Sequence, residues 1–260
     1  MQAQHRGFVT PGVSDVPVPG GAAEARQHRR VTSFRSRRAA LTEAQQEVWE
    51  RLWPTLGRQA VPDTGAAPEA LDAERWFGRA ADLILEIGCG TGTSTLAMAR
   101  SEPDTDVIAV EVYRRGLAQL LNAIDREQVT NIRMVRGDGV DVLEQLVKPD
   151  SLTGVRVFFP DPWPKSRHHK RRLIQPATVA LIADRLRPGG VLHAATDHAG
   201  YAEQIAEVGE SEPRLRRALP GEPLPISVQR PATKYETKAR EAGSAVTELI
   251  WIKADRAEHG

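Results

Sequence analysis

Apolar and polar positions follow a regular pattern from about residue 81 to the end of the chain. Apolar runs of strand length, such as ADLILEIG, alternate with stretches whose apolar residues recur at helical spacing, such as RGLAQLLNAIDREQ. The pattern predicts strands at 81–88, 106–113, 131–138, 155–159 and 191–197, and helices at 92–103, 115–128, 139–147, 175–190 and 201–211. Such alternation is typical of right-handed βαβ units, so we predict an α/β fold with a mostly parallel sheet and helices on both faces. A last strand, 245–254, comes after a Pro-rich segment rather than a clear helix, and we expect it to pair antiparallel.

The N-terminal part has a different composition. Residues 1–30 are rich in Pro, Gly, Ala and Arg without apolar periodicity, and we predict a disordered basic tail there. Residues 31–260 should form a single domain with an N-terminal helical extension. Thr42 is a suitable N-cap for a helix that Pro54 should end, and a loop over roughly 57–72 should lead to a short amphipathic piece at 74–77.

Composition says more about the cellular compartment of the protein than about its function. The chain has 260 residues, 35 basic and 34 acidic, so its net charge of +1 does not indicate a nucleic-acid-binding protein. The single cysteine, Cys89, excludes an intrachain disulfide framework and argues against a cysteine-ligated metal site. Because the apolar runs are only of strand length and the first residues lack a signal-peptide pattern, we expect a cytoplasmic protein without membrane contact.

A glycine-rich segment, EIGCGTGTST, starts at Glu86 between the first of these strands and its helix. Gly88, Gly90 and Gly92 permit a tight turn and close approach of a ligand to the helix N-terminus. The third glycine comes too early for the dinucleotide G-x-G-x-x-G spacing, and the segment lacks the Gly-Lys-Ser/Thr of a phosphate-binding loop. A structural turn is the alternative.

Acidic residues end the next strands: Glu111 the second, Asp138 the third, and Asp161 just past the fourth. Each alone could be a solvated carboxylate, but open α/β sheets bind ligands at this edge. The acids would suit a nucleoside with a cationic centre and an amino group, as in S-adenosylmethionine. Together with E-x-G-x-G, the pattern resembles the Rossmann-like class I methyltransferases.

The segment VRVFFPDPWPKSRHHKRRL, from Val155 to Leu173, carries the most specific signal. Prolines on both sides of Asp161 fix the backbone, the acid can bond a target base, and Trp163 can stack on it, although a strand-end turn with a buried tryptophan is the alternative. A basic run comes next, which favours phosphate binding over a merely solvated helix face. At helical spacing Arg167, Lys170 and Arg171 share a face and Arg172 points elsewhere. The run consists of Lys165, Arg167, His168, His169, Lys170, Arg171 and Arg172, and its histidines lack metal-like spacing.

FPDPWPKSRHHKRR resembles the signature of the tRNA (guanine-N7)-methyltransferase family. RVTSFRSRRAALTEAQ, LEIGCGTG, AVEVYRRG, AATDHAGYAE and RPATKYE occur in the family's order, so the resemblance covers about residues 29 to 252. It implies methyl transfer from S-adenosylmethionine, without a metal, to N7 of a tRNA guanosine in the variable loop. The partner is then tRNA, and the enzyme a monomer or homodimer.

The resemblance also implies residue roles. Glu86, Glu111, Asp138 and Asp161 would line the S-adenosylmethionine pocket with the three glycines, and Asp161 would be the catalytic residue. The residues implied to contact guanosine are Lys165, Asp197, Thr233, Lys234, Tyr235 and Glu236. Arg167 to Arg172 would grip tRNA.

Some positions depart from the family pattern. Arg115 stands where Pro is usual, Tyr235 replaces Phe, Ala39-Ala40 replaces Gly-Arg, and TKAREAGSAV comes after Glu236 in place of a glycine-rich stretch. Two other functions compete: methylation of an amino nitrogen in DNA or of a protein amide, and RNA binding by a non-catalytic Rossmann-like core.

Overall fold

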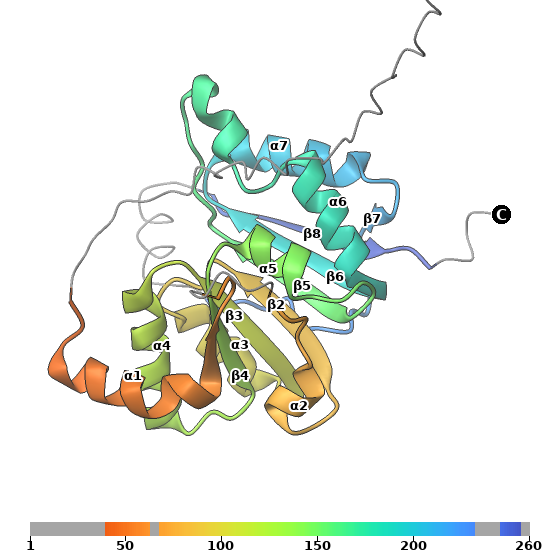
Figure 1. Cartoon of the computed structure of the whole chain (residues 1–260). Helices are drawn as coiled ribbons and strands as arrows, with labels where there is room; N and C mark the ends of the chain where they lie inside the picture. Colours follow the sequence, from red (N-terminus) through yellow and green to blue (C-terminus); the bar gives the residue numbers. More distant parts are fainter. Residues whose placement is uncertain (1–39, 63–67, 232–244, 256–260) are drawn as a thin grey trace, which may run out of the picture. The chain divides into compact units, whose positions relative to one another are not determined.

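A computed structural model describes residues 40–62, 68–231 and 245–255 of the chain (Figure 1). The predicted tail, residues 1–30, lies outside the described residues. So do Thr233, Lys234, Tyr235, Glu236 and the TKAREAGSAV departure up to residue 244. All of the described residues belong to one compact unit, Thr32–Gly260.

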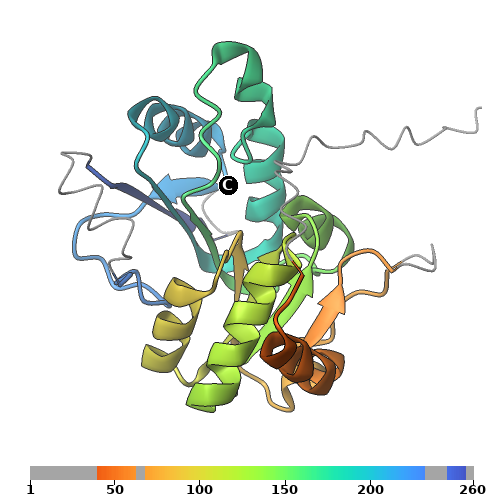
Figure 2. The same ribbon diagram turned by 90° about the vertical axis from the view of Figure 1, so that its left-hand side faces the viewer.

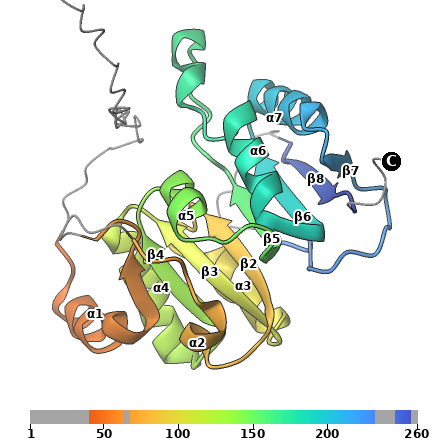
Figure 3. The same ribbon diagram turned by 45° about the vertical axis from the view of Figure 1, so that its right-hand side comes forward.

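The centre of this unit is an eight-stranded sheet in the order β1-β4-β3-β2-β5-β6-β8-β7 (Figure 3). The strands from β1 to β6 pair in parallel, β8 pairs antiparallel with β6, and β7 pairs antiparallel with β8. The prediction of a mostly parallel sheet with an antiparallel C-terminal strand is therefore confirmed. The strands are β1 (Gly57–Gln59), β2 (Asp82–Ile87), β3 (Thr105–Glu111), β4 (Ile132–Arg136), β5 (Leu152–Phe158), β6 (Leu186–Thr196), β7 (Leu215–Arg217) and β8 (Thr247–Lys253).

Helices cover both faces of the sheet, as the continuous apolar runs of its strands predict. Successive residues of a strand point to opposite faces, so Ile84 packs with α3 and α4 residues while Leu85 packs with residues of α5, α6 and α7. The first face is covered by α1 (Glu43–Leu56), α3 (Thr93–Ser101) and α4 (Arg114–Glu127), and the second by α2 (Ala73–Phe77), α5 (Gly139–Gln145), α6 (Pro176–Arg185) and α7 (Ala199–Ser211).

The strand order reverses direction between β2 and β5. From β2 the chain moves outward through β3 and β4, then returns to place β5 on the other side of β2 and continues to β6 (Figure 1). The carboxyl ends of β2 and β5 therefore lie side by side, and open α/β sheets bind ligands at such a switch point.

Two predicted helix ends are wrong. The first helix does not end at Pro54 but continues to Leu56, where the backbone N–H of Gly57 donates to the Trp53 carbonyl. Packing holds this turn: Trp53 stacks on Trp49 with ring centroids 4.1 Å apart. Figure 2 shows this helix, α1, lying against α4.

The other wrong end concerns α6, which stops at Arg185 rather than at the glycine pair Gly189-Gly190. Pro188 disfavours helical backbone at the residue before it, and Leu186 to Gly190 instead open β6. The register with β5 shifts there, because Leu186 faces Leu152 while Val191 already faces Gly154. The short strands β1 and β7 were not predicted, and β1 occupies part of the expected loop.

Candidate active site

The glycine loop between β2 and α3 provides an open backbone surface. Gly88, Gly90 and Gly92 have φ values of 80°, 58° and 76°, in the left-handed region that favours glycine. A Cβ at Gly88 or Gly90 would meet no described atom within 4 Å, whereas one at Gly92 would lie 2.5 Å from Leu120. The first two glycines therefore leave room for a ligand at the backbone, and the third allows α3 and α4 to pack closely.

Glu111, at the end of β3, anchors this loop. Its Oε2 accepts a hydrogen bond from the Gly90 N–H at 2.9 Å, and its Oε1 accepts from the Val112 and Tyr113 N–H groups at 2.7 and 3.0 Å. Burial raises the pKa of Glu111, these three N–H groups lower it, and the charge of Asp161 raises it further. The carboxylate thus holds the loop in place, and the charge of Asp161 is close enough to act on it.

Glu86 is buried beneath the same loop, with 3% of its surface exposed. Its Oε1 accepts a hydrogen bond from the Thr95 hydroxyl at 3.0 Å, and its Oε2 has no hydrogen-bond partner among the described residues. Burial raises the pKa of Glu86, while the charge of Arg156 on the neighbouring strand lowers it. A buried acceptor without a partner is unfavourable, so this oxygen suits a donor from a bound molecule. Together with the open glycine backbone, it fits the polar groups of S-adenosylmethionine.

Acidic residues stand at the carboxyl ends of four strands of the sheet. Asp138 lies just past β4, Glu111 ends β3, Asp161 lies past β5 and Asp197 past β6. Asp138 also caps α5, because its Oδ1 accepts from the Val140 N–H at 2.8 Å. Asp161 and Asp197 are exposed and come after strands that pair directly, so both can reach a substrate at this edge. Their roles stay predictions.

The loop that carries Asp161 has an unusual backbone. Phe159 and Trp163, on either side of it, have φ values of 49° and 42°, which bulky residues rarely adopt. The Phe159 N–H donates to the Ala195 carbonyl at 2.8 Å, which ties the start of the loop to β6. Strained backbone of this kind clusters at functional sites.

The basic run divides into two groups. Its residues form a 3₁₀ helix, η1 (Ser166–Arg171), in which residues three apart share a face, so Arg167 and Lys170 are exposed together. Arg171 was predicted to share this face, but its guanidinium carbon instead lies 4.9 Å from the centre of the Trp163 ring. Lys165 is exposed, whereas His168 and His169 are partly buried, with the His168 ring 5.7 Å from that of Trp163.

Arg172 is buried, with 4% of its surface exposed, and its guanidinium bonds groups within the protein. It donates to the Pro162 carbonyl at 2.7 Å and to the Gln204 side chain at 2.7 Å. Its burial leaves little of the guanidinium for RNA phosphates, and the implied role of Arg172 in gripping tRNA stays a prediction.

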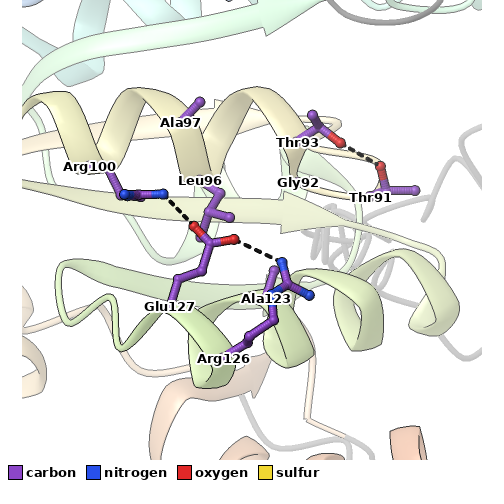
Figure 4. Close-up of a pocket in the computed structure, with 9 residues that line it drawn as sticks. All are labelled: Thr91, Gly92, Thr93, Leu96, Ala97, Arg100, Ala123, Arg126 and Glu127. Atoms are coloured by element: carbon purple, nitrogen blue, oxygen red, sulfur yellow. Dashed lines mark hydrogen bonds and ion pairs between the residues drawn. The ribbon is translucent and has the colours of Figure 1, made fainter.

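A groove of 340 Å³ lies between α3 and α4, and Thr91 and Gly92 at the end of the glycine loop form part of its lining (Figure 4). The two arginines that line it, Arg100 and Arg126, both pair with Glu127, at 2.6 and 2.8 Å. None of the strand-end acids lines it. The described part of the chain contains no cluster of three His, Cys, Asp or Glu side chains suited to a metal ion. Within the same residues, no helix combines the length and the apolar character needed to cross a membrane.

One group of buried polar residues was missed in the sequence. Arg156 on β5 and His193 on β6 are fully buried, face each other across the two strands, and share the sheet face of Glu86. The signal was a polar residue inside an otherwise apolar strand, Arg156 in VRVFF and His193 in VLHAAT, since a polar group buried there requires partners. Arg230 gave no comparable signal, because it belongs to the Pro-rich segment before the last strand.

The sheet order, the glycine loop at the switch point and the strand-end acids together define a Rossmann-like class I methyltransferase. Residues 80–249 match a protein family described as "Putative methyltransferase". The tRNA (guanine-N(7)-)-methyltransferase of Mycolicibacterium paratuberculosis is 63% identical over 255 residues, which cover 97% of each chain. The protein of the same name from Mycobacterium sp. (strain KMS) is 72% identical over 229 residues, 88% of this chain and 83% of that one. The chain belongs to the tRNA (guanine-N(7)-)-methyltransferase family.

Among solved structures, a crystal structure of an aminoglycoside resistance methyltransferase is similar with a TM-score of 0.48 and 16% identity, over 72% of this chain and 95% of that one.

Proposed function

We propose that this protein transfers a methyl group from S-adenosylmethionine to N7 of a guanosine in the variable loop of tRNA. The observation that carries the proposal is the position of Asp161, exposed at the switch point beside the glycine loop and next in the sheet to Asp197. Membership of the family supports the choice of tRNA and of guanine. We expect the enzyme to act in the cytoplasm, as a monomer or homodimer.

The described residues offer S-adenosylmethionine a suitable set of polar groups. The donor supplies an electrophilic methyl group attached to a positively charged sulfur. Glu86 offers the acceptor Oε2, and Gly88 and Gly90 offer open backbone. Glu111 already accepts three N–H groups, and since a carboxylate has about four acceptor sites, one is left for a ribose hydroxyl. Asp138 would accept from a ribose or from an exocyclic amine.

The acids at β5 and β6 would orient the base. Guanine N7 carries an in-plane lone pair and no proton, so no base is needed to deprotonate it. The enzyme has to align N7 with the methyl group, and orientation of this kind can lower a barrier by about 7–11 kcal/mol. Asp161 and Asp197 can accept from the N1–H and amino groups of guanine, as carboxylates accept from base donors. The positive charge that methylation leaves on the purine is stabilised by the same carboxylates.

The exposed cations next to Asp161 would bind the tRNA backbone. Lys165, Arg167 and Lys170 are exposed and precede Arg171 and Arg172 in the chain. Arginine and lysine contacts to phosphates give affinity and orientation without reading sequence. A role for Thr233 to Glu236 at the guanosine stays part of this proposal and lies outside the described residues.

The test is direct. Purified protein is incubated with radiolabelled S-adenosylmethionine and an unmodified tRNA transcript, and borohydride reduction with aniline cleavage then locates N7-methylguanosine. A transcript whose variable-loop guanosine is replaced by adenosine is the control. Label that depends on the guanosine, with cleavage at that position, is expected. Label that persists in the control transcript, or label without cleavage, would refute the proposal.

The alternative of a non-catalytic RNA-binding protein predicts a different result in a simpler measurement. Titration calorimetry with S-adenosylmethionine should show binding if the glycine loop and Glu86 form a donor site. Absence of binding by folded protein would favour the alternative.

A further inference from the structure

A short segment before the last strand lies along the sheet beside β5. We call residues 226–230 the strap. Ile226 lies over Gly154, where an added Cβ would come within 2.6 Å of the Ile226 side chain, and the Ser227 carbonyl accepts from Arg156 Nη2 at 3.0 Å. Arg230 reaches the end of the strand, at Phe158. The strap therefore runs in the direction of β5, on the face that α3 covers, toward the loop that carries Asp161.

Buried charges attach the strap to the sheet. Arg156 is fully buried, and its Nη2 pairs with Glu102 Oε2 at 2.6 Å. The other oxygen of Glu102 accepts from the Ser227 N–H at 2.7 Å. A buried charge is stable only when it is paired, so this arrangement fixes the strap where it crosses Arg156.

Arg230 is held firmly at the far end of the strap, with 2% of its side chain exposed. It pairs with Glu248 Oε1 at 3.1 Å, and Glu248 Oε2 bonds His193 Nε2 at 2.9 Å. Its guanidinium carbon lies 5.4 Å from the centre of the Phe158 ring and 4.9 Å from that of Phe159. These distances permit cation–π attraction, which is stronger when the cation is desolvated.

The two strained residues around Asp161 are therefore each in contact with an arginine. Phe159, with φ 49°, contacts Arg230, and Trp163, with φ 42°, contacts Arg171 at 4.9 Å. Strained backbone persists only where the surroundings fix it. If the arginine contacts fix these two residues, we expect their loss to let φ relax toward negative values and to change the direction in which the turn between them points Asp161.

We propose that Arg230 is a positioning residue for methyl transfer: it holds Phe159 in the left-handed conformation and so directs Asp161 at the base. Arg171 does the same for Trp163 from the other side. The inference rests on the proposed function, because it assumes that Asp161 orients the guanine. It adds that Arg171, within the basic run, acts on the loop rather than on RNA phosphates.

The test compares arginines that both lie on an aromatic ring. Arg230→Ala removes the contact, and Arg230→Lys keeps the charge but not the flat guanidinium. The control is Arg133→Ala, because Arg133 is partly buried on β4 and lies 4.6 Å from the centre of the Phe77 ring, away from the strand-end acids. Thermal unfolding, kcat, and KM for tRNA and for S-adenosylmethionine are measured for each variant.

Arg230→Ala should lower kcat about tenfold or more, since a misplacement of roughly 1 Å can lower a rate by about 100-fold, while both KM values change by less than about twofold. Arg230→Lys should recover part of kcat. Arg133→Ala should keep kcat within about twofold of wild type at a similar loss of Tm. Equal kcat losses in Arg230→Ala and Arg133→Ala would overturn the inference. If Arg230→Ala does not fold, Arg230→Lys decides: a lowered kcat supports the inference, and a wild-type kcat overturns it.

A second measurement keeps the inference separate from the proposed function. Crystal structures of the wild type and of Arg230→Lys without ligands should show Phe159 at positive φ in the first and displaced toward negative φ in the second. Unchanged φ in the variant would overturn the inference. Failure of the wild type to form N7-methylguanosine would refute the proposed function and leave this backbone comparison valid.

Discussion

Substitution of Gly116 by alanine should damage the donor site from outside it. Gly116 lies in the first turn of α4, where an added Cβ would stand 2.3 Å from the Gly90 carbonyl oxygen and 3.4 Å from Glu111 Cγ. Ordinary contacts begin near 3.4 Å, so one of the two backbones must move by about 1 Å. Overpacking of this kind destabilises a protein by about 1–3 kcal/mol.

We expect the glycine loop to move rather than α4. The α4 side chains are packed into the core, whereas Gly90 is attached to Glu111 Oε2 by a hydrogen bond that can lengthen. We expect Gly116→Ala to weaken S-adenosylmethionine binding about tenfold or more, in addition to the loss of stability, since the bond and the open backbone shift together. Calorimetric titration gives the affinity, and thermal unfolding gives the stability.

Gly200→Ala is the matched control. Gly200 also lies in the first turn of a helix, α7, at the same edge of the sheet, but the nearest atom to its added Cβ is 3.6 Å away. Alanine is the better helix former by up to about 1 kcal/mol, so this variant should be as stable as wild type or more so, with unchanged affinity for the donor. A Gly116→Ala protein that binds S-adenosylmethionine within about twofold of wild type would show that the contact between α4 and the loop does not control the site.

The same geometry predicts three further outcomes. Asp161→Ala should lower kcat about 100-fold, the scale of lost electrostatic stabilisation, with less than about threefold change in tRNA Kd; near-wild-type turnover would remove Asp161 from the mechanism. The double variant Arg167→Glu/Lys170→Glu should weaken tRNA binding and reduce the slope of log K against log salt concentration by up to about 2. Lys148→Glu, at an exposed position before β5, should leave that slope unchanged. Equal slopes for the two variants in filter binding would contradict phosphate binding by Arg167 and Lys170. Burial raises the pKa of Glu86, so the folded state loses stability as the pH rises from the unfolded value through the raised pKa. Glu86→Gln should therefore raise Tm more near pH 7 than near pH 5, while weakening donor binding. A Tm gain independent of pH would argue against a buried charge at Glu86.

The main elements of the fold were predictable because each is encoded locally. The spacing of apolar residues differs between a buried strand, such as the one around Ile84, and an amphipathic helix, such as the one around Leu117. Strands that alternate with helices can be connected in only a few topologies. The errors came where packing overrides local preference. Pro54 stays helical because Trp53 stacks on Trp49, and the Leu186 segment became strand because β5 offers it a partner.

The site divides in the same way. Gly88, Gly90, Glu111, Asp138 and Asp161 could be found because a residue at or just after the end of a parallel strand lies at the carboxyl edge of the sheet, whatever the position of that strand in the sheet. The functions of the basic residues could not be assigned in this way, because neighbours in sequence have different surroundings in the folded chain.

The sequence by itself therefore determined the class of fold, the glycine loop and the acidic strand ends, since these depend on spacing along the chain and on residue chemistry. Only the tertiary structure decided that Arg171 lies on the Trp163 ring and that Arg172 donates to the Pro162 carbonyl, while Arg167 and Lys170 are exposed. It also brought Arg230 onto Phe159, a residue far from it in the chain. The physical reason is burial: a cation is placed by the aromatic rings and carboxylates that surround it in the fold, and residues distant in sequence supply them.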